Sequence, residues 1–289
     1  MPKQRVVIIG AAGYVAQQIL PDFRERYDLV LIDVSNVTRD GTEIEDVIVE
    51  DMLSGESSEY EDLFSGSEAV LHLGRKRREG DPIDHFRIEN ANVQMNYNVF
   101  RTAFEVGVSR VVYASSNHAA DWYEQARIHD RKMENLDPYT LPLSHSFYGW
   151  AKASTENMGF LFACGAFGRQ LEVVNVRIGT PAEVDYLRAK DIRSFKRHLG
   201  SYISPRDMAQ LLIKAIETPN INNEDGVPWQ IVYGISDNTR AYWSLISARD
   251  VLGYSPDDDA EVKFSEQISR HLTKLPGAEG RVGILKDEV

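Results

Sequence analysis

The sequence predicts an α/β protein with a doubly wound parallel sheet and a smaller C-terminal lobe. Three observations predict this fold class. Runs of branched apolar residues alternate with segments of helical periodicity, a glycine-rich turn follows the first run, and no repeat or low-complexity linker interrupts the order. Strands that are buried on both faces read as continuous apolar runs, and the connecting helices cover both faces of a parallel sheet. Ligands bind such sheets at the carboxyl ends of the strands.

The first strand and its turn predict a dinucleotide site. Residues 6–9 are all β-branched, and Gly10-Ala11-Ala12-Gly13-Tyr14-Val15-Ala16 follows them. The glycines permit a tight turn and a close backbone approach, and the next helix can hold a pyrophosphate at its N-terminus. A second strand, 28–33, ends at Asp33, 20 residues after Gly13, where an acid can meet the adenosine ribose. A carboxylate there repels a 2′-phosphate, so we expect NAD rather than NADP.

The remaining elements continue the alternation. We expect strands at 47–52, 69–74, 110–116, 171–177 and 229–234 and a helix at 88–106, and a helix that carries Tyr148 and Lys152 extends over 154–167. The least regular segments are 79–85, 123–146 and 179–204. The predicted organisation is an NAD-binding domain over 1–176, joined by the later strand near 229–234, and a substrate-binding lobe over 177–275. We interpret the polar, glycine-rich segment 276–289 as a mobile tail.

The composition of the chain argues against several kinds of binding partner. The chain has 289 residues, 43% hydrophobic content and a formal net charge of −12, which argues against nucleic-acid and membrane partners. No apolar run is long enough to span a bilayer, and the N-terminus lacks a signal-peptide core. The single cysteine, Cys164, excludes an intrachain disulfide and favours the cytoplasm, and its apolar neighbours predict a core position. No Cys/His cluster has metal-ligand spacing, so we expect no metal.

Tyr148 and Lys152 form the candidate catalytic pair. Residues four apart share one face of a helix, and an ammonium beside a phenol favours the phenolate. Such a phenolate can take a proton from an alcohol near neutral pH. A surface Tyr/Lys pair is the alternative, because this spacing is common by chance. The preceding strand, glycine-rich turn, helix, strand and acid favour the functional interpretation.

With these motifs the chain resembles the extended short-chain dehydrogenase/reductase family, from about Val6 to about Phe264. Segments 114–118, 176–179 and 232–238 are most similar to those of uronate dehydrogenases and related NAD-dependent sugar dehydrogenases. The last segment also resembles an archaeal NAD-dependent glucose-6-phosphate dehydrogenase. The resemblance implies a Rossmann-like fold and an oxidoreductase of carbohydrate metabolism.

The resemblance also implies residue roles. Ser116 would hydrogen-bond the reacting oxygen, Tyr148 would remove the proton of the anomeric hydroxyl, and Lys152 would support Tyr148 and hold the nicotinamide ribose. A hydride would pass from C1 of the sugar to NAD and leave a lactone. The implied cofactor contacts are Gly10, Gly13, Tyr14, Val15, Asp33, Asp51, Met52, Leu73, Gly74, Asn92, Tyr148 and Lys152.

The substrate side has three candidate groups besides Ser116 and Tyr148. Asn117 and His118 suit sugar hydroxyls, although they could instead satisfy the backbone of a loop. Arg177 would pair with a substrate carboxylate, as the resemblance implies, or act as a structural arginine. Residues 75–78 are four consecutive cations where uronate dehydrogenases have a short neutral stretch with a serine. From these we select Arg77 as an anion contact, and a solvated loop is the alternative.

The main hypothesis is oxidation at C1 of an anionic aldose, a uronate or a sugar phosphate. A nucleotide-sugar epimerase or dehydratase, which would keep NAD bound through its cycle, is the second hypothesis. A non-catalytic dinucleotide sensor is the third. The sugar itself and the direction of flux stay open, and fold analogy suggests a homodimer.

Overall fold

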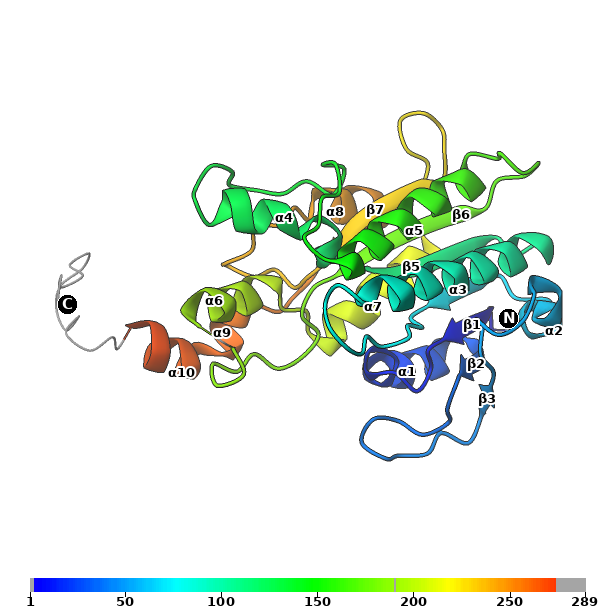
Figure 1. Ribbon diagram of the computed structural model, residues 1–289, viewed down its shortest axis with the longest axis horizontal. Coiled ribbons are helices and arrows are strands. Elements are labelled where there is room, and N and C mark those ends of the chain that lie inside the picture. The colour runs from blue at the N-terminus through cyan, green and yellow to red at the C-terminus, as the bar shows by residue number, and fades with distance from the viewer. Residues whose placement is uncertain (1–2, 190, 274–289) are drawn as a thin grey trace.

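The computed structural model describes residues 3–189 and 191–273, and all seven strands among them form one parallel sheet (Figure 1). The strand order is β3-β2-β1-β4-β5-β6-β7. The strands are β1 (Arg5–Ile9), β2 (Asp28–Asp33), β3 (Val47–Val49), β4 (Ala69–His72), β5 (Arg110–Ser116), β6 (Glu172–Ile178) and β7 (Trp229–Gly234). The expected doubly wound fold is confirmed, because the chain builds outward from β1 in one direction and then in the other.

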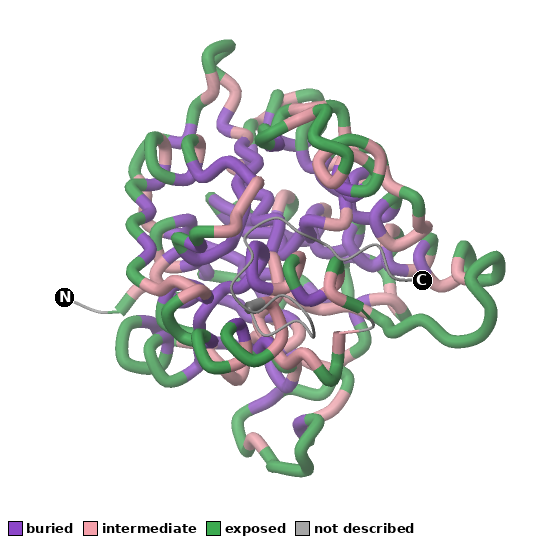
Figure 2. The backbone as a smooth tube through the Cα atoms, turned by 90° about the vertical axis from the view of Figure 1, so that its left-hand side faces the viewer, coloured by how far each residue is buried: buried purple, intermediate pink, exposed green. Residues whose placement is uncertain are grey.

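Helices cover both faces of the sheet, as two hydrophobic clusters show. Strand side chains such as Ile8 and Val112 pack with α1 (Tyr14–Arg26), α7 (Pro205–Glu217) and α8 (Ile246–Leu252). The alternate side chains, such as Val7 and Val111, pack with α2 (Glu61–Phe64), α3 (His85–Glu105) and α5 (Phe147–Ala163). Successive residues of a strand point to opposite faces, so each strand contributes to both clusters. Figure 2 shows the buried backbone in the middle of the molecule and the exposed loops at its rim.

A third, smaller cluster lies beyond the sheet, on the C-terminal side of the chain. It joins α6 (Ile192–Ser201), α9 (Ala260–Lys263) and α10 (Ser265–Ile268) through Phe195, Leu199, Tyr202 and Phe264. The remaining short helices are η1 (Ser57–Glu59), η2 (Asn117–Ala120), α4 (Asp121–Tyr123), η3 (Glu124–Ile128) and η4 (Ser269–Thr273). No helix in the described part of the chain is long and apolar enough to cross a membrane.

Several boundaries differ from the sequence-based prediction. The edge strand β3 ends at Val49 and α5 ends at Ala163, both earlier than expected. Helix α6 lies inside a segment that was expected to be irregular. The prediction of a buried Cys164 was wrong: this residue caps the C-terminus of α5 and is exposed. The predicted mobile tail, 276–289, lies outside the described residues.

Candidate active site

A cleft of about 800 Å³ opens at the point where the strand order reverses between β1 and β4. The backbone turns after these two strands touch there. Gly10 has a φ of +84°, and a Cβ atom on it would lie 2.7 Å from the backbone nitrogen of Gly74. Only glycine fits this position, because it combines a left-handed backbone with contact to another main chain. The crevice at this reversal is where doubly wound folds bind their ligands.

Most of the expected cofactor residues line this cleft. They are Gly10, Gly13, Tyr14, Asp33, Asp51, Met52, Leu73, Gly74 and Asn92. Val15 is not among the lining residues. Tyr148 and Lys152 are also not among them, and Lys152 instead lines a small polar cavity together with Gly74 and Asn92.

Asp33 and Asn92 hold the loops around the cleft. Asp33 Oδ2 accepts a hydrogen bond from the Ala12 backbone nitrogen at 2.9 Å, so the acid fixes the glycine-rich turn. The buried amide of Asn92 accepts from the Lys76 backbone nitrogen at 2.8 Å and donates to the Lys76 oxygen at 3.0 Å. Asn92 therefore fixes the start of the basic segment 75–78 onto α3.

Tyr148 and Lys152 lie on α5 as the spacing predicted. Ser146 is the N-cap of this helix, and its Oγ accepts a hydrogen bond from the Gly149 nitrogen at 3.2 Å. A serine in this position stabilises a helix start. The Lys152 ammonium lies 5.9 Å from the centre of the Tyr148 ring. The cap thus sets where the half-buried phenol stands.

The Lys152 side chain is buried between α5 and the sheet. Its Nζ donates to the backbone oxygen of Ala114, at the end of β5, at 2.6 Å. Burial, and then the positive charge of Arg75, lower the pKa of Lys152 to about 7, whereas Glu89 and Glu156 act in the opposite direction. At neutral pH the Lys152 side chain is therefore close to the midpoint of its titration between the charged ammonium and the neutral amine.

Ser115 and Ser116 end β5 and have different partners. Ser115 Oγ donates to the buried carboxylate of Glu156 at 2.5 Å. Ser116 Oγ accepts from the backbone nitrogen of His118 at 3.2 Å, so it caps the short helix η2. The neighbouring Asn117 is 2% exposed, and its Nδ2 has no hydrogen-bond partner within the described chain. This buried amide keeps a donor available at the end of β5.

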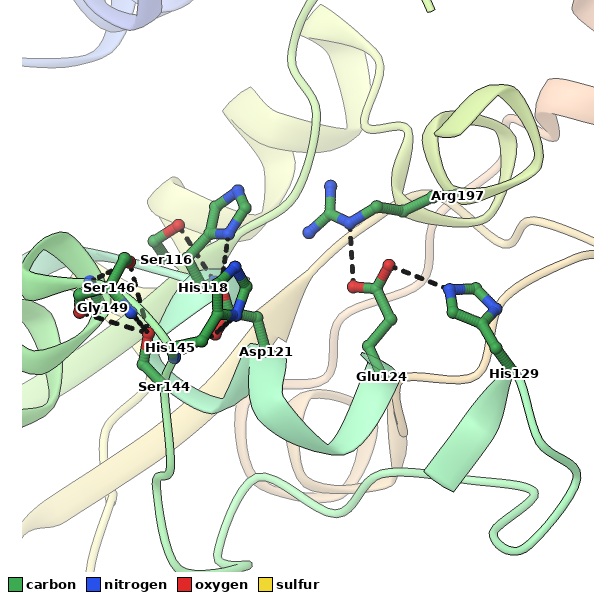
Figure 3. A network of polar contacts seen from close by, with 10 residues as sticks. All are labelled: Ser116, His118, Asp121, Glu124, His129, Ser144, His145, Ser146, Gly149 and Arg197. Atoms are coloured by element: carbon green, nitrogen blue, oxygen red, sulfur yellow. Dashed lines mark hydrogen bonds and ion pairs between the residues drawn. The ribbon is translucent and has the colours of Figure 1, made fainter. Parts of the chain in front are cut away.

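Figure 3 shows a polar network that the sequence did not predict, and His118 connects this network to Tyr148. Asp121 accepts from His118 Nδ1 at 2.8 Å and lies 3.0 Å from His145 Nδ1. The His118 ring meets the Tyr148 ring edge-on, with centroids 5.8 Å apart. Burial alone would raise the pKa of Asp121, but its contacts with the two imidazoles hold that pKa below the ordinary value. The shared carboxylate therefore orients His118 beside the phenol.

A second group of contacts in Figure 3, around Glu124, joins η3 to α6. Glu124 is 1% exposed and accepts from Arg197 Nε at 2.8 Å, and His129 Nε2 lies 3.3 Å from its other oxygen. Arg197 also lies over the Trp243 ring, 5.7 Å from its centroid. These contacts fix the segment after the Asn117-His118 pair against the C-terminal side of the molecule.

Two arginines of the basic segment lie over the face of Tyr148. The guanidinium carbons of Arg75 and Arg78 are 4.4 Å and 5.0 Å from the centroid of the phenol ring. Both approach Glu89, which is 1% exposed, at 3.5 Å. Arg77, the residue selected from the sequence, is exposed and lines the cofactor cleft together with Arg75, but it does not lie over the Tyr148 ring. The sequence identified the cationic segment, but only the fold shows that Arg75 and Arg78 are the members that lie over Tyr148.

The position of Arg177 disagrees with its expected role as an anchor for a substrate carboxylate. Its side chain is fully buried and forms a two-pronged ion pair with Glu156, at 2.9 Å and 2.7 Å. Nη1 donates to the Pro138 oxygen and to the Tyr233 hydroxyl. A guanidinium enclosed in this way has no surface to offer a sugar, so the structure corresponds to the alternative of a structural arginine.

Gly149 allows the start of α5 to pack against η2 and the loop at Ser144. A Cβ atom at this position would lie 2.1 Å from the backbone oxygen of His118 and 2.1 Å from Ser144 Oγ. We expect Gly149→Ala to lower the free energy of unfolding by about 3 kcal/mol, since a backbone oxygen cannot move aside as a side chain can. Urea denaturation measures the change. The same shift would displace Tyr148, so activity should fall as well.

Gly159 on the same helix provides the matched control. A Cβ atom there would meet the Val173 Cγ1 atom at 3.1 Å, which is a side-chain contact that a small movement relieves. Alanine also gains about 1 kcal/mol of helix propensity over glycine. The Gly159→Ala variant should stay close to the parent protein in stability. Equal losses for the two variants would contradict the close-contact explanation for Gly149.

The model of the NAD dependent epimerase/dehydratase family matches residues 6–181. The chain belongs to this family. The expected extended short-chain dehydrogenase/reductase family and its NAD cofactor are thereby confirmed. So is the class of enzyme, an NAD-dependent dehydrogenase.

Curated relatives align over most of their length. The chain is 32% identical over 274 residues to an NAD-dependent glucose-6-phosphate dehydrogenase of Haloferax volcanii. This alignment covers 90% of this chain and 96% of the relative. It is 28% identical to a uronate dehydrogenase of Pseudomonas syringae pv. tomato, over 90% of this chain and 84% of the relative. The crystal structure of uronate dehydrogenase from Agrobacterium tumefaciens matches with a TM-score of 0.70 and 25% identity, covering 100% of this chain and 93% of that one.

The cleft fits the NAD of this family. Gly13 at the N-cap of α1 has no side chain to cover the first turn, which leaves that helix end open to a pyrophosphate. The contact between the Gly10 and Gly74 turns brings main chain to the floor of the cleft. Asp33 lines the cleft at the end of β2, and its carboxylate would accept a hydrogen bond from a ribose hydroxyl.

Proposed function

We propose that the protein oxidises C1 of an anionic aldose, a uronate or a sugar phosphate, to the corresponding lactone. The proposal depends chiefly on one observation. Tyr148 stands beside the cofactor cleft, and the guanidiniums of Arg75 and Arg78 lie over its ring. The chain as a whole, by contrast, has a formal net charge of −12. A local positive field in an acidic protein favours a negatively charged small molecule. The names of the relatives support the same substrate class.

NAD, when bound, accepts the hydride that leaves C1. We assign the remaining work to the chain's own residues. Tyr148 Oη takes the proton of the anomeric hydroxyl, and Ser116 Oγ donates a hydrogen bond to the same oxygen. Lys152 supplies positive charge near the phenolate and would hold the nicotinamide ribose. In the balanced reaction, the C1–H bond and the O–H bond break, and a carbonyl forms at C1.

The rest of the site would position the substrate and the cofactor. His118, oriented by Asp121, offers its Nε2 to a sugar hydroxyl, and Asn117 offers its unpaired amide nitrogen. Residues 1–176 with β7 would bind NAD. The lobe over 177–275 would cover the sugar. Precise placement of both reactants is the main contribution of a protein to cofactor chemistry of this kind.

A substrate screen tests the proposal. The purified protein is mixed with NAD and with uronates, aldose phosphates and neutral aldoses, and the absorbance of reduced nicotinamide is followed. We expect turnover with at least one anionic aldose and a lower kcat/KM for its neutral counterpart. Absence of turnover across all three groups would refute the proposal. Interconversion of a nucleotide sugar without net NAD reduction would favour an epimerase or dehydratase.

A further inference from the structure

We propose that Arg75 and Arg78, positioned by Glu89, form a phosphate subsite beside Tyr148. This inference rests on the proposed function and assigns the substrate to the aldose phosphates. The two guanidiniums converge on one ring, with their central carbons 4.4 Å and 5.0 Å from its centroid. An anion bound by both arginines would therefore lie next to Tyr148, the residue that faces C1 of the sugar in the proposed function.

The charges of this cluster do not balance. Two arginines share the single carboxylate of Glu89, and each ion pair is 3.5 Å long. The other Glu89 oxygen accepts a hydrogen bond from Asn92 Nδ2 at 3.0 Å, so the carboxylate is shared between this amide and the two guanidiniums. The buried Nε of Arg75 has no hydrogen-bond partner in the described chain. The cluster therefore keeps a net positive charge that an anionic ligand would balance.

Neighbouring groups do not remove this excess. His118 and His145 share the carboxylate of Asp121, and the charge of Glu156 is matched by Arg177. Lys152 adds to the positive field when protonated. Among the described acids only Glu89 forms an ion pair with Arg75 or Arg78.

The number of donors favours a phosphate over a carboxylate. One guanidinium satisfies the two oxygens of a carboxylate in a fork-to-fork pair. A phosphate ester carries up to two charges and three oxygens that accept strong hydrogen bonds. Two guanidiniums on one anion therefore match a phosphate in both charge and number of acceptors. Glu89 keeps the pair in place when no ligand is bound.

Binding of inorganic phosphate tests the subsite without depending on turnover. Calorimetry is carried out on the full chain loaded with NAD, at a pH above the second ionisation of phosphate, and acetate serves as the carboxylate probe. In the Arg75→Gln/Arg78→Gln double variant we expect the Kd of phosphate to rise about 10- to 100-fold. Glu89→Gln should bind phosphate more tightly, because a competing charge is lost. An unchanged Kd in the double variant would overturn the proposal.

Arg87→Gln is the matched control, since Arg87 is an exposed arginine at the start of the same helix, α3, and has no ion pair in the described structure. It should bind phosphate like the parent protein. Acetate that binds as tightly as phosphate would overturn the assignment to phosphate. If the double variant does not fold, Arg75→Lys/Arg78→Lys, which keeps the charge and loses the fork, should still weaken phosphate binding.

Kinetics connect the subsite to the substrate. The ratio of kcat/KM for an aldose phosphate to that for the matching neutral aldose should fall about 10- to 100-fold in the double variant, chiefly through KM. A ratio that does not change would contradict the inference while leaving dehydrogenase activity intact. Phosphate binding that depends on both arginines, in a protein that oxidises no aldose, would instead support the subsite and refute the proposed function.

Discussion

The Tyr148→Phe variant is expected to bind NAD like the parent protein and to lose about 10²- to 10⁴-fold in kcat/KM, because it lacks the group that accepts the substrate proton. Phenylalanine keeps the ring on which Arg75 and Arg78 lie, so the charged cluster should stay in place. Steady-state kinetics on the best substrate of the screen measure the loss, and quenching of protein fluorescence by NAD measures cofactor binding.

Tyr97→Phe is the control for this experiment. Tyr97 is an exposed tyrosine on α3 that is not among the residues lining the cofactor cleft, and its variant should keep full activity. A Tyr148→Phe enzyme that loses less than tenfold in kcat/KM would exclude the phenol as the base. A loss of NAD binding in parallel with rate would assign Tyr148 to cofactor binding instead.

Glu156→Ala should cause the largest loss of stability among the substitutions considered. Glu156 is 1% exposed and Arg177 is fully buried, so the variant would leave a guanidinium with its charge uncompensated inside the protein. Breaking one partner of a buried pair costs about 3–5 kcal/mol. Ser115 would lose its acceptor as well. Urea denaturation at neutral pH measures the change in the free energy of unfolding.

Two further variants separate the causes of this loss. Ser115→Ala removes one hydrogen bond and keeps the ion pair, so it should cost only about 1 kcal/mol. Replacing both partners, Glu156→Leu/Arg177→Met, should recover much of the stability, because no buried charge remains. A double variant that is as unstable as Glu156→Ala would contradict the explanation by an uncompensated charge.

Local patterns predicted the sheet and the position of the candidate catalytic pair on one helix. The strand, glycine-rich turn and acid lie within one continuous stretch, and Tyr148 and Lys152 lie on one helix, so their proximity follows from helix geometry alone. The spacing of Ile192, Phe195 and Leu199 is helical, and it marks α6 inside a segment that was expected to be irregular.

Contacts between distant segments could not be predicted. The pairing of Arg177 with Glu156 depends on how β6 lies under α5, and a single sequence does not record this register. The same holds for the basic segment, where the turn after β4 brings Arg75 and Arg78 rather than Arg77 over the phenol. His145 and Asp121 meet for a similar reason, because the loop before α5 approaches the start of α4.

The interior position of β1 in the sheet has a consequence for the nascent chain. β1 pairs with β2 on one side and with β4 on the other. During synthesis β2 emerges soon after β1, but the opposite edge of β1 stays open until β4 leaves the ribosome. An open apolar edge is a template for pairing with other chains, and parallel pairings between distant segments form slowly. Aggregation of the nascent chain should therefore depend on how soon β4 closes that edge.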